Sequence, residues 1–226
     1  PSLHKIESEL EQAFRYFRYY FPDKEIPMVV SMISGLTQSV ITVDSILAVA
    51  LDKYLGRDED IYKQARLYNY LIYNMHPGKI PSDCMRAWGM KEFEMEDQGS
   101  TLLDHLLYEG KIMYFTQKML PGESDTLIWG FTPEQMDFCR NNEEQMWVFL
   151  VENNLLFKTD LATINKYTRE GPFTRDFTNE SPARAAVWLG MQIIKEFMRK
   201  NKEYDLPALM EENDNEKILR LSKYNP

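Results

Sequence analysis

The first residues of the chain alternate apolar and charged side chains at the spacing of a helix surface. Leu3, Ile6, Leu10, Phe14 and Phe17 are separated by three or four positions, and Glu, Lys and Arg stand between them. Side chains at this spacing share one face of a helix. Proline at position 22 cannot continue a helix. The pattern therefore predicts an amphipathic helix over residues 3–20.

The next part of the chain has the sequence pattern of β-strands. Residues 28–33 and 39–43 are short runs rich in β-branched and apolar side chains, and Gly35 lies between them. Residues 46–51 form a third, continuous apolar run. Runs of this length bounded by turn residues are typical of strands. We predict three strands of a partly buried sheet.

Helical spacing dominates from Asp58 onward. Apolar residues follow it over 61–72, which ends near the break at Pro77-Gly78, and Pro81 is expected to start the next helix. A longer helix is expected to begin at Thr101, with Asp104 three residues later as in a capping box, and to run through residue 120.

The last part of the chain contains two further helix starts and a long loop. Thr132-Pro133 begins one helix, because Thr caps well and Pro suits the first turn. Ser181-Pro182 repeats the arrangement before an apolar helix over 183–198. Residues 158–180 are predicted to be mainly loop.

These elements together predict the fold class. A helix, a small sheet and a helical majority, in that order, are typical of an α+β fold. The sequence has no internal repeat and no linker-like segment, so we expect a single domain over residues 1–226.

The charge of the chain excludes some function classes. A formal net charge of -9 opposes binding to nucleic acid or to an anionic membrane surface, since both need clustered Lys and Arg. No apolar run is long enough to span a bilayer. Cys84 and Cys139 form no CxxC pair, and we interpret them as buried small apolar residues, with a single disulfide as the alternative.

Several ordered strings resemble the gliding-motility lipoprotein B family of Bacteroidetes-type bacteria. They span most of the chain and are Tyr20-Phe21-Pro22, Ile33-Ser34-Gly35, Ala50-Leu51-Asp52-Lys53-Tyr54-Leu55-Gly56, Leu107-Tyr108-Glu109-Gly110-Lys111-Ile112-Met113-Tyr114-Phe115, Gly130-Phe131-Thr132-Pro133-Glu134-Gln135, Ser181-Pro182-Ala183-Arg184, Trp188-Leu189-Gly190 and Ser222-Lys223-Tyr224-Asn225-Pro226.

The resemblance implies an envelope lipoprotein that faces the periplasm and works in gliding motility or the associated secretion system. It also implies an N-terminal lipidated cysteine. Neither cysteine of this chain suits that role, so we expect the only membrane attachment to be a lipid anchor in an upstream segment that is absent from this chain.

The family is similar in turn to predicted zinc proteases of zincin-like fold. In these proteases one helix carries HExxH and a later helix carries a Glu-Gly pair, which Glu109-Gly110 looks like. The resemblance therefore implies a helix-rich, zincin-like fold in which the small N-terminal sheet packs on the helical majority.

The residues do not support a standard zincin site. HExxH needs two histidines one helical turn apart, and the chain has only His4, His76 and His105. The nearest degenerate position is 91–95, where Glu92 matches the glutamate but Lys and Met stand at the histidine positions. The favoured interpretation there is the charged face of an ordinary helix.

His105 and Glu109 are the better candidate pair, because a spacing of four places both side chains on one helix face. Such a pair can bind a metal or share a proton, and His76 would be a third ligand if the fold brought it near. A His and a Glu at this spacing are more often a helix-surface pair or a satisfied buried hydrogen bond. Lys111 and Arg184 are candidate polar members of the same cleft or structural ion-pair partners.

The leading hypothesis is a non-enzymatic envelope protein of the motility or secretion apparatus. It would be a scaffold with a degenerate metal site and no cofactor, and it would bind a protein or peptide partner through cleft residues His105, Glu109, Lys111, Arg184 and Glu92. Two alternatives remain open at this stage. One is a divergent metal-dependent hydrolase, a zinc peptidase using His105, Glu109 and Glu92, and the other is a small-molecule-binding lipoprotein.

Overall fold

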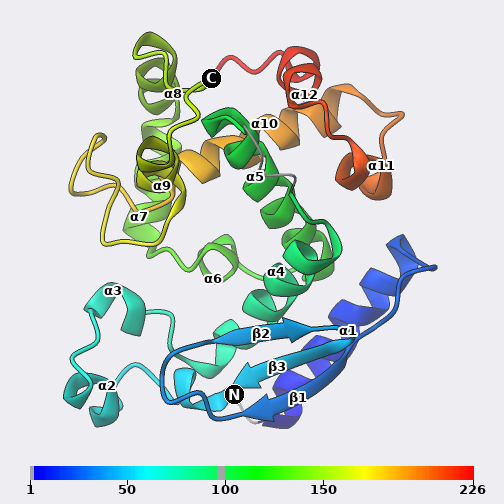
Figure 1. Ribbon diagram of the computed structural model, residues 1–226, viewed down its shortest axis with the longest axis vertical. Helices are drawn as coiled ribbons and strands as arrows, with labels where there is room; N and C mark the ends of the chain where they lie inside the picture. The colour runs from blue at the N-terminus through cyan, green and yellow to red at the C-terminus, as the bar shows by residue number, and fades with distance from the viewer. Residues whose placement is uncertain (1–2, 96–99) are drawn as a thin grey trace. The chain divides into compact units, whose positions relative to one another are not determined.

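The computed structural model describes residues 3–95 and 100–226. The chain divides into two compact units (Figure 1). The first comprises residues 1–92 and 115–130, and the second residues 93–114 and 131–226. The prediction of a single domain over residues 1–226 stays a prediction.

The first unit contains the small sheet and the helices around it. The strand order is β1-β3-β2, with β1 parallel and β2 antiparallel to β3. All three strands fall within the predicted runs, so the predicted sheet is confirmed. The elements are α1 (Leu3–Tyr20), β1 (Met28–Met32), β2 (Val40–Val43), β3 (Ile46–Ala50), η1 (Leu51–Lys53), α2 (Asp60–Gln64), α3 (Asn69–Ile72), η2 (Pro77–Lys79), α4 (Ile80–Glu92), the end of α5 (Leu102–Met119) and α6 (Asp125–Trp129).

The core of the first unit is built on one face of the sheet. Leu47 and Val49 of β3 are buried on that face, and Figure 1 shows α1 lying behind the sheet. Phe17 of α1 makes edge-to-face contacts with Trp88 of α4 and with Phe115, at ring-centroid distances of 6.4 and 6.0 Å. Apart from Leu3, which is exposed, the predicted apolar stripe of α1 is thus the stripe that is buried.

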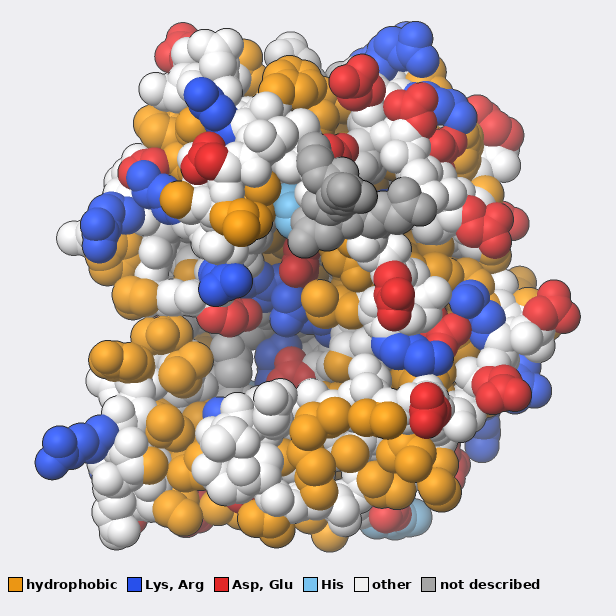
Figure 2. Space-filling view, viewed as in Figure 1, with side chains coloured by type: hydrophobic (Ala, Val, Ile, Leu, Met, Phe, Trp, Pro, Cys, Tyr) orange, Lys and Arg blue, Asp and Glu red, His pale blue; other side chains and the backbone are white. Residues whose placement is uncertain are grey.

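The opposite face of the sheet leaves apolar side chains exposed. Met28 lies opposite Ile46, which lies opposite Val43, and all three are exposed. Figure 2 shows hydrophobic side chains gathered over this region. Alternation along a strand explains the pattern, since residues two apart point to the same face.

The second unit is helical in its described part. Helix α10 is buried along most of its length, and α12, α9 and α8 pack against it. The elements are the start of α5, α7 (Pro133–Asn141), α8 (Glu143–Glu152), α9 (Leu161–Thr168), α10 (Ala185–Lys200), α11 (Leu206–Glu211) and α12 (Asn215–Ser222). With the sheet confined to the first unit, the chain is a helix-rich α+β protein, as predicted.

Two predicted helix starts are confirmed in detail. Thr132 and Gln135 form a capping box at the start of α7. At the start of α5 the backbone nitrogen of Thr101 donates to Asp104 Oδ2 at 2.7 Å, and the backbone nitrogen of Asp104 donates back to Thr101 Oγ1 at 3.3 Å. These local bonds satisfy amides that the first helical turn leaves open.

One further local prediction is confirmed only in part, and another was wrong. Residues 158–180 are mainly loop, as predicted, but they also contain α9, which Asp160 caps by accepting a hydrogen bond from the backbone nitrogen of Thr163. Ser181 does not cap α10. Its hydroxyl is buried and bonds instead to Thr174, and α10 begins after Arg184, which has a left-handed backbone with φ of 62°. The tertiary partner of Ser181 therefore overrides its local capping preference.

None of the helices within residues 3–95 and 100–226 combines the length and the hydropathy of a membrane-spanning segment. Cys84 and Cys139 are both free and buried, which confirms their interpretation as small core residues and excludes the disulfide.

Candidate functional site

Two glycines let α5 and α10 approach each other closely in the second unit. A Cβ atom on Gly190 would lie 2.0 Å from the carbonyl oxygen of Leu106, and one on Gly110 would lie 2.6 Å from the carbonyl carbon of Gly190. Such distances leave no room for any side chain. The Glu-Gly and Leu-Gly strings thus meet at this crossing, with Glu109 and Lys111 on either side of Gly110.

An ion pair joins Glu109 to Arg184 beside this crossing. Arg184 Nη2 lies 3.3 Å from Glu109 Oε2, and Nη1 lies 3.1 Å from Glu170 Oε1. The Arg184 side chain is 4% exposed and that of Glu109 is 14% exposed. A buried guanidinium must be paired, because an uncompensated buried charge costs several kcal/mol, of the order of 3 to 5. Glu109 is therefore committed to a cation that the chain itself supplies.

Lys111 is buried on the other side of Gly110. Its Nζ donates to the backbone carbonyl of Glu212 at 2.8 Å. Burial lowers the pKa of Lys111 to about 8, against the opposing attraction of the Glu212 charge. Lys111 thus holds the end of α11, and its amine loses its charge at a lower pH than an ordinary lysine does.

The Glu212 carboxylate forms its own cluster. Lys217 Nζ lies 2.6 Å and the Tyr204 hydroxyl 2.9 Å from Glu212 Oε2. The hydrogen bond from Lys217 is the main cause that lowers the pKa of Glu212 to about 2. This carboxylate stays ionised at every physiological pH.

His105 lies half-buried near the start of α5. Its Nε2 is 2.9 Å from the hydroxyl of Ser100. The adjacent Asp104 accepts from Thr101 and, through Oδ1, from the side-chain amide of Asn215 at 2.9 Å. The structure thus ties this end of α5 to the loop before it and to α12.

Glu92 belongs to the first unit, where it has two cationic partners. Its carboxylate lies 3.0 Å from Lys24 Nζ and 2.7 Å from Lys91 Nζ. Burial opposes ionisation of Glu92, but the hydrogen bonds from Lys91 and Lys24 outweigh it and lower its pKa. Helix α4 ends at Glu92, so residues 91–95 are not a helical turn and the interpretation of this segment as a helix face was wrong beyond Glu92.

Of the five predicted site residues, the structure brings Glu109 and Arg184 into direct contact. Lys111 is placed one residue beyond Gly110, and His105 one helical turn before Glu109 on the same helix. Among the described residues no group of three or more His, Cys, Asp and Glu side chains is arranged to hold a metal ion. Zinc and the third-ligand role of His76, a residue of the first unit, stay untested predictions.

A buried polar cluster in the first unit was missed at the level of sequence. Lys79 Nζ lies 2.8 Å from Ser82 Oγ, 3.1 Å from Asp83 Oδ1 and 3.0 Å from the carbonyl oxygen of Ile128, and Tyr54 donates to Asp83 Oδ2 at 2.7 Å. The spacing of Lys79, Ser82 and Asp83 at a helix start was a usable signal. Its bonds join three separate segments, which identifies a structural role.

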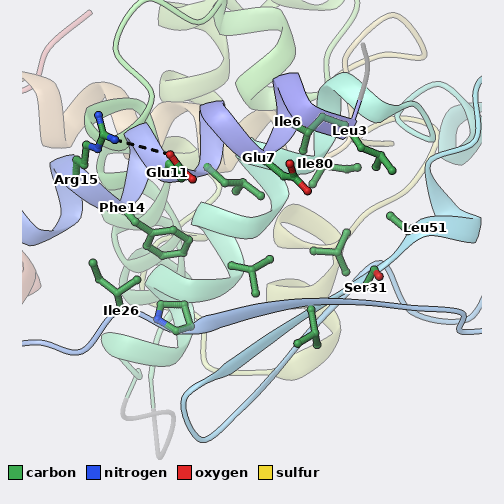
Figure 3. A pocket seen from close by; sticks show the side chains of 15 residues that line it. Leu3, Ile6, Glu7, Glu11, Phe14, Arg15, Ile26, Ser31, Leu51 and Ile80 are labelled. Atoms are coloured by element: carbon green, nitrogen blue, oxygen red, sulfur yellow. Dashed lines mark ion pairs between the residues drawn. The ribbon is translucent and has the colours of Figure 1, made fainter.

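The first unit also contains an apolar groove, here called the α1–β1 groove (Figure 3). It has a volume of about 640 Å³ and lies between α1 and the edge strand β1. Side chains of both elements line it, together with Ile80, the first residue of α4. The members are Leu3, Ile6, Glu7, Leu10, Glu11, Phe14, Arg15, Ile26, Pro27, Val29, Val30, Ser31, Val49, Leu51 and Ile80. No sequence pattern predicted this groove.

Comparisons with curated proteins and with solved structures find no match. The zincin-like part of the predicted fold accordingly stays a prediction. A family model does match, and it covers residues 1–226, through both units and through the strings that meet at the α5–α10 crossing. Its description is gliding motility protein GldB, so the chain belongs to this family of gliding-motility lipoproteins.

Proposed function

We propose that this chain is a non-enzymatic, periplasm-facing lipoprotein that serves the gliding machinery by binding a protein or peptide partner. Membership of the family supports association with the cell envelope and work in gliding motility. Three further properties are proposed here: the protein catalyses no reaction, it faces the periplasm, and it binds a partner.

One observation carries the non-enzymatic part of this proposal. The carboxylate of Glu109, which the zincin comparison makes a metal ligand, lies 3.3 Å from a buried arginine. A guanidinium at this distance repels a divalent cation and occupies one of the two carboxylate oxygens of Glu109. Glu109 and His105 then act as structural residues of α5.

Metal analysis of purified protein tests this part. After exposure to excess zinc and desalting, we expect substoichiometric metal in the wild type, in His105→Ala and in Glu109→Gln. Stoichiometric zinc in the wild type that is lost in His105→Ala would reject the proposal in favour of the metal-dependent hydrolase.

Partner binding is tested separately. The protein, anchored through its N-terminal end, is cross-linked in envelope fractions and the bound proteins are identified against an unrelated lipoprotein as control. We expect enrichment of components of the motility or secretion apparatus. Recovery of the same proteins with both baits would contradict a binding function.

A further inference from the structure

We infer that the α1–β1 groove receives an extended, apolar segment of a partner protein that carries Lys or Arg and adds to the sheet as a strand beside β1. This inference rests on the proposed binding function and specifies the chemistry of the partner. Four features of the first unit carry it, namely the open edge of β1, the lining of the groove, the absence of charge along the strand and the carboxylates on the rim.

The first feature is the open hydrogen-bonding edge of β1. Within the described residues β1 pairs with β3 on one side only. The backbone nitrogen of Met28 donates toward β3, to Ser45, at 2.8 Å. Alternate residues of a strand turn their amides to opposite sides, so Val29 and Ser31 direct theirs to the open edge. An incoming strand finds unpaired donors and acceptors there.

The second feature is the lining of the groove beside this edge. Val29 and Ser31 stand opposite Leu47 and Val49 in the register, so their side chains share the face of the sheet that is buried at β3. At β1 the same face stays exposed, because the groove separates it from α1. Figure 3 shows Ile6 and Phe14 of α1 above this space. Alternate apolar side chains of an added strand would fill it.

The third feature is the absence of charge along the edge. Residues 26–43 contain no Asp, Glu, Lys, Arg or His. Edge strands that must stay unpaired are usually protected by charged side chains, bulges or prolines. Here Pro27 stands just before the strand, and β1 itself has none of these devices. The edge offered by the five residues of β1 is uncharged and lies beside an apolar groove, so it is suited to pairing with another strand.

The fourth feature is the charge of the rim. Glu7 and Glu11 of α1 line the groove with one cation, Arg15, which lies 3.7 Å from Glu11. Figure 3 shows both carboxylates on the helix side of the groove. The excess of negative charge favours a partner that brings Lys or Arg.

The same charges disfavour a second copy of this chain as the occupant. Two β1 strands paired antiparallel would be related by a two-fold axis perpendicular to the joined sheet, which keeps both α1 helices on one face. The carboxylates of the two rims would then face each other. We therefore assign the groove to a different protein.

A peptide-binding experiment on the full chain tests the inference. The probe is a fluorescein-labelled peptide of alternating valine and threonine with a lysine at each end, followed by anisotropy. We expect saturable binding, at least about tenfold weaker when alternate peptide amides are N-methylated, because strand addition depends on backbone hydrogen bonds. A peptide with glutamate at each end is expected to bind more weakly than the lysine form.

Variants of the protein locate the binding. Val29→Pro removes an outward amide without removing a donor to β3, so it is expected to weaken binding about tenfold. Glu7→Lys is expected to weaken it through charge alone, and Asp58→Lys, an equal change at an exposed position outside the groove, to leave it unchanged. Thermal unfolding midpoints check that each variant is folded. If Val29→Pro does not fold, Glu7→Lys alone tests the groove.

Several outcomes would overturn the inference. The first is that no peptide binds. The second is that peptide affinity is unchanged by N-methylation or by both groove variants. The third is concentration-dependent dimerisation that Val29→Pro abolishes. Uptake of a small apolar dye by the groove without peptide binding would assign it to small molecules instead. If an envelope partner is captured equally well by wild type and Val29→Pro, the groove assignment falls and the proposed function stands.

Discussion

Buried charge is the main residue-scale feature of the second unit. Arg184 and Lys111 are cations held inside the protein, the first by two carboxylates and the second by a backbone carbonyl. Both were predicted as members of a cleft or as ion-pair partners. The contacts of Arg184 favour the ion-pair interpretation, because one terminal nitrogen of its guanidinium lies beside Glu109 and the other beside Glu170.

Loss of Arg184 is expected to destabilise the protein strongly. Arg184→Met leaves Glu109 half-buried without its cation, and we expect the free energy of unfolding to fall by about 3 kcal/mol. Urea denaturation measures this change. Arg199→Met is the matched control, since Arg199 is largely exposed and pairs with Glu196 on the surface. An equal, small effect of both substitutions would contradict a structural role for Arg184.

Lys111 is expected to make stability depend on pH in the alkaline range. Its pKa is about 8 in the folded state and ordinary in the unfolded state, so between these values the unfolded chain binds more protons. Stability therefore rises with pH through this window and is reduced below the folded pKa.

Comparison with Lys111→Met isolates this effect. The free energy of unfolding of the wild type minus that of Lys111→Met is expected to rise by about 3 kcal/mol between neutral and strongly alkaline pH. Urea denaturation of both proteins across this range gives the difference. A difference that does not change with pH would show that the buried amine keeps its ordinary pKa.

At the scale of elements, local signals were sufficient where the partners are close in sequence. The stripe of α1, the three strands and the capping boxes of α5 and α7 depend on residues within a few positions of each other. Ser181 was predicted wrongly because its partner, Thr174, lies in an adjoining loop and not in the following helix.

The crossing of α5 and α10 is expected to be intolerant of any side chain. Gly190→Ala would place a methyl group 2.0 Å from the carbonyl oxygen of Leu106, so the helices must separate. We expect a loss of about 3 kcal/mol or failure to fold, as for overpacked cores. Gly171→Ala is the control, because its nearest neighbour would be 3.8 Å away. Thermal unfolding midpoints of Gly190→Ala and Gly171→Ala are compared with that of the wild type. Similar midpoints for the two variants would contradict the close crossing.

The Asp52 side chain holds the turn before β2 in place. Its carboxylate accepts from the backbone nitrogens of Ser34 at 3.0 Å and Leu36 at 2.7 Å, where Gly35 and Leu36 have positive φ. Asp52→Ala is expected to lower the free energy of unfolding by about 2 kcal/mol, since two amides lose a charged acceptor. Asp60→Ala, at an exposed site, should have little effect in the same urea titration. Equal effects would show that the turn does not depend on Asp52.

At the scale of the whole molecule, neither compact unit is a continuous segment. The chain passes between the units at 92/93, 114/115 and 130/131. We therefore expect one cooperative unfolding transition, in which Asp52→Ala in the first unit and Gly190→Ala in the second lower the same midpoint. Calorimetry with two resolved transitions, each moved by one variant, would instead establish two domains.

The sequence by itself determined the helix-rich α+β class, the strands and the longest helices, α1, α4, α5 and α10, because periodicity and capping act over a few residues. It also excluded an HExxH site, since that requires only a count of three dispersed histidines. The tertiary structure alone decided that Glu109 meets Arg184, 75 positions away, and that a groove separates α1 from β1. Such contacts depend on how buried faces pack against one another, and a one-dimensional pattern does not contain that information.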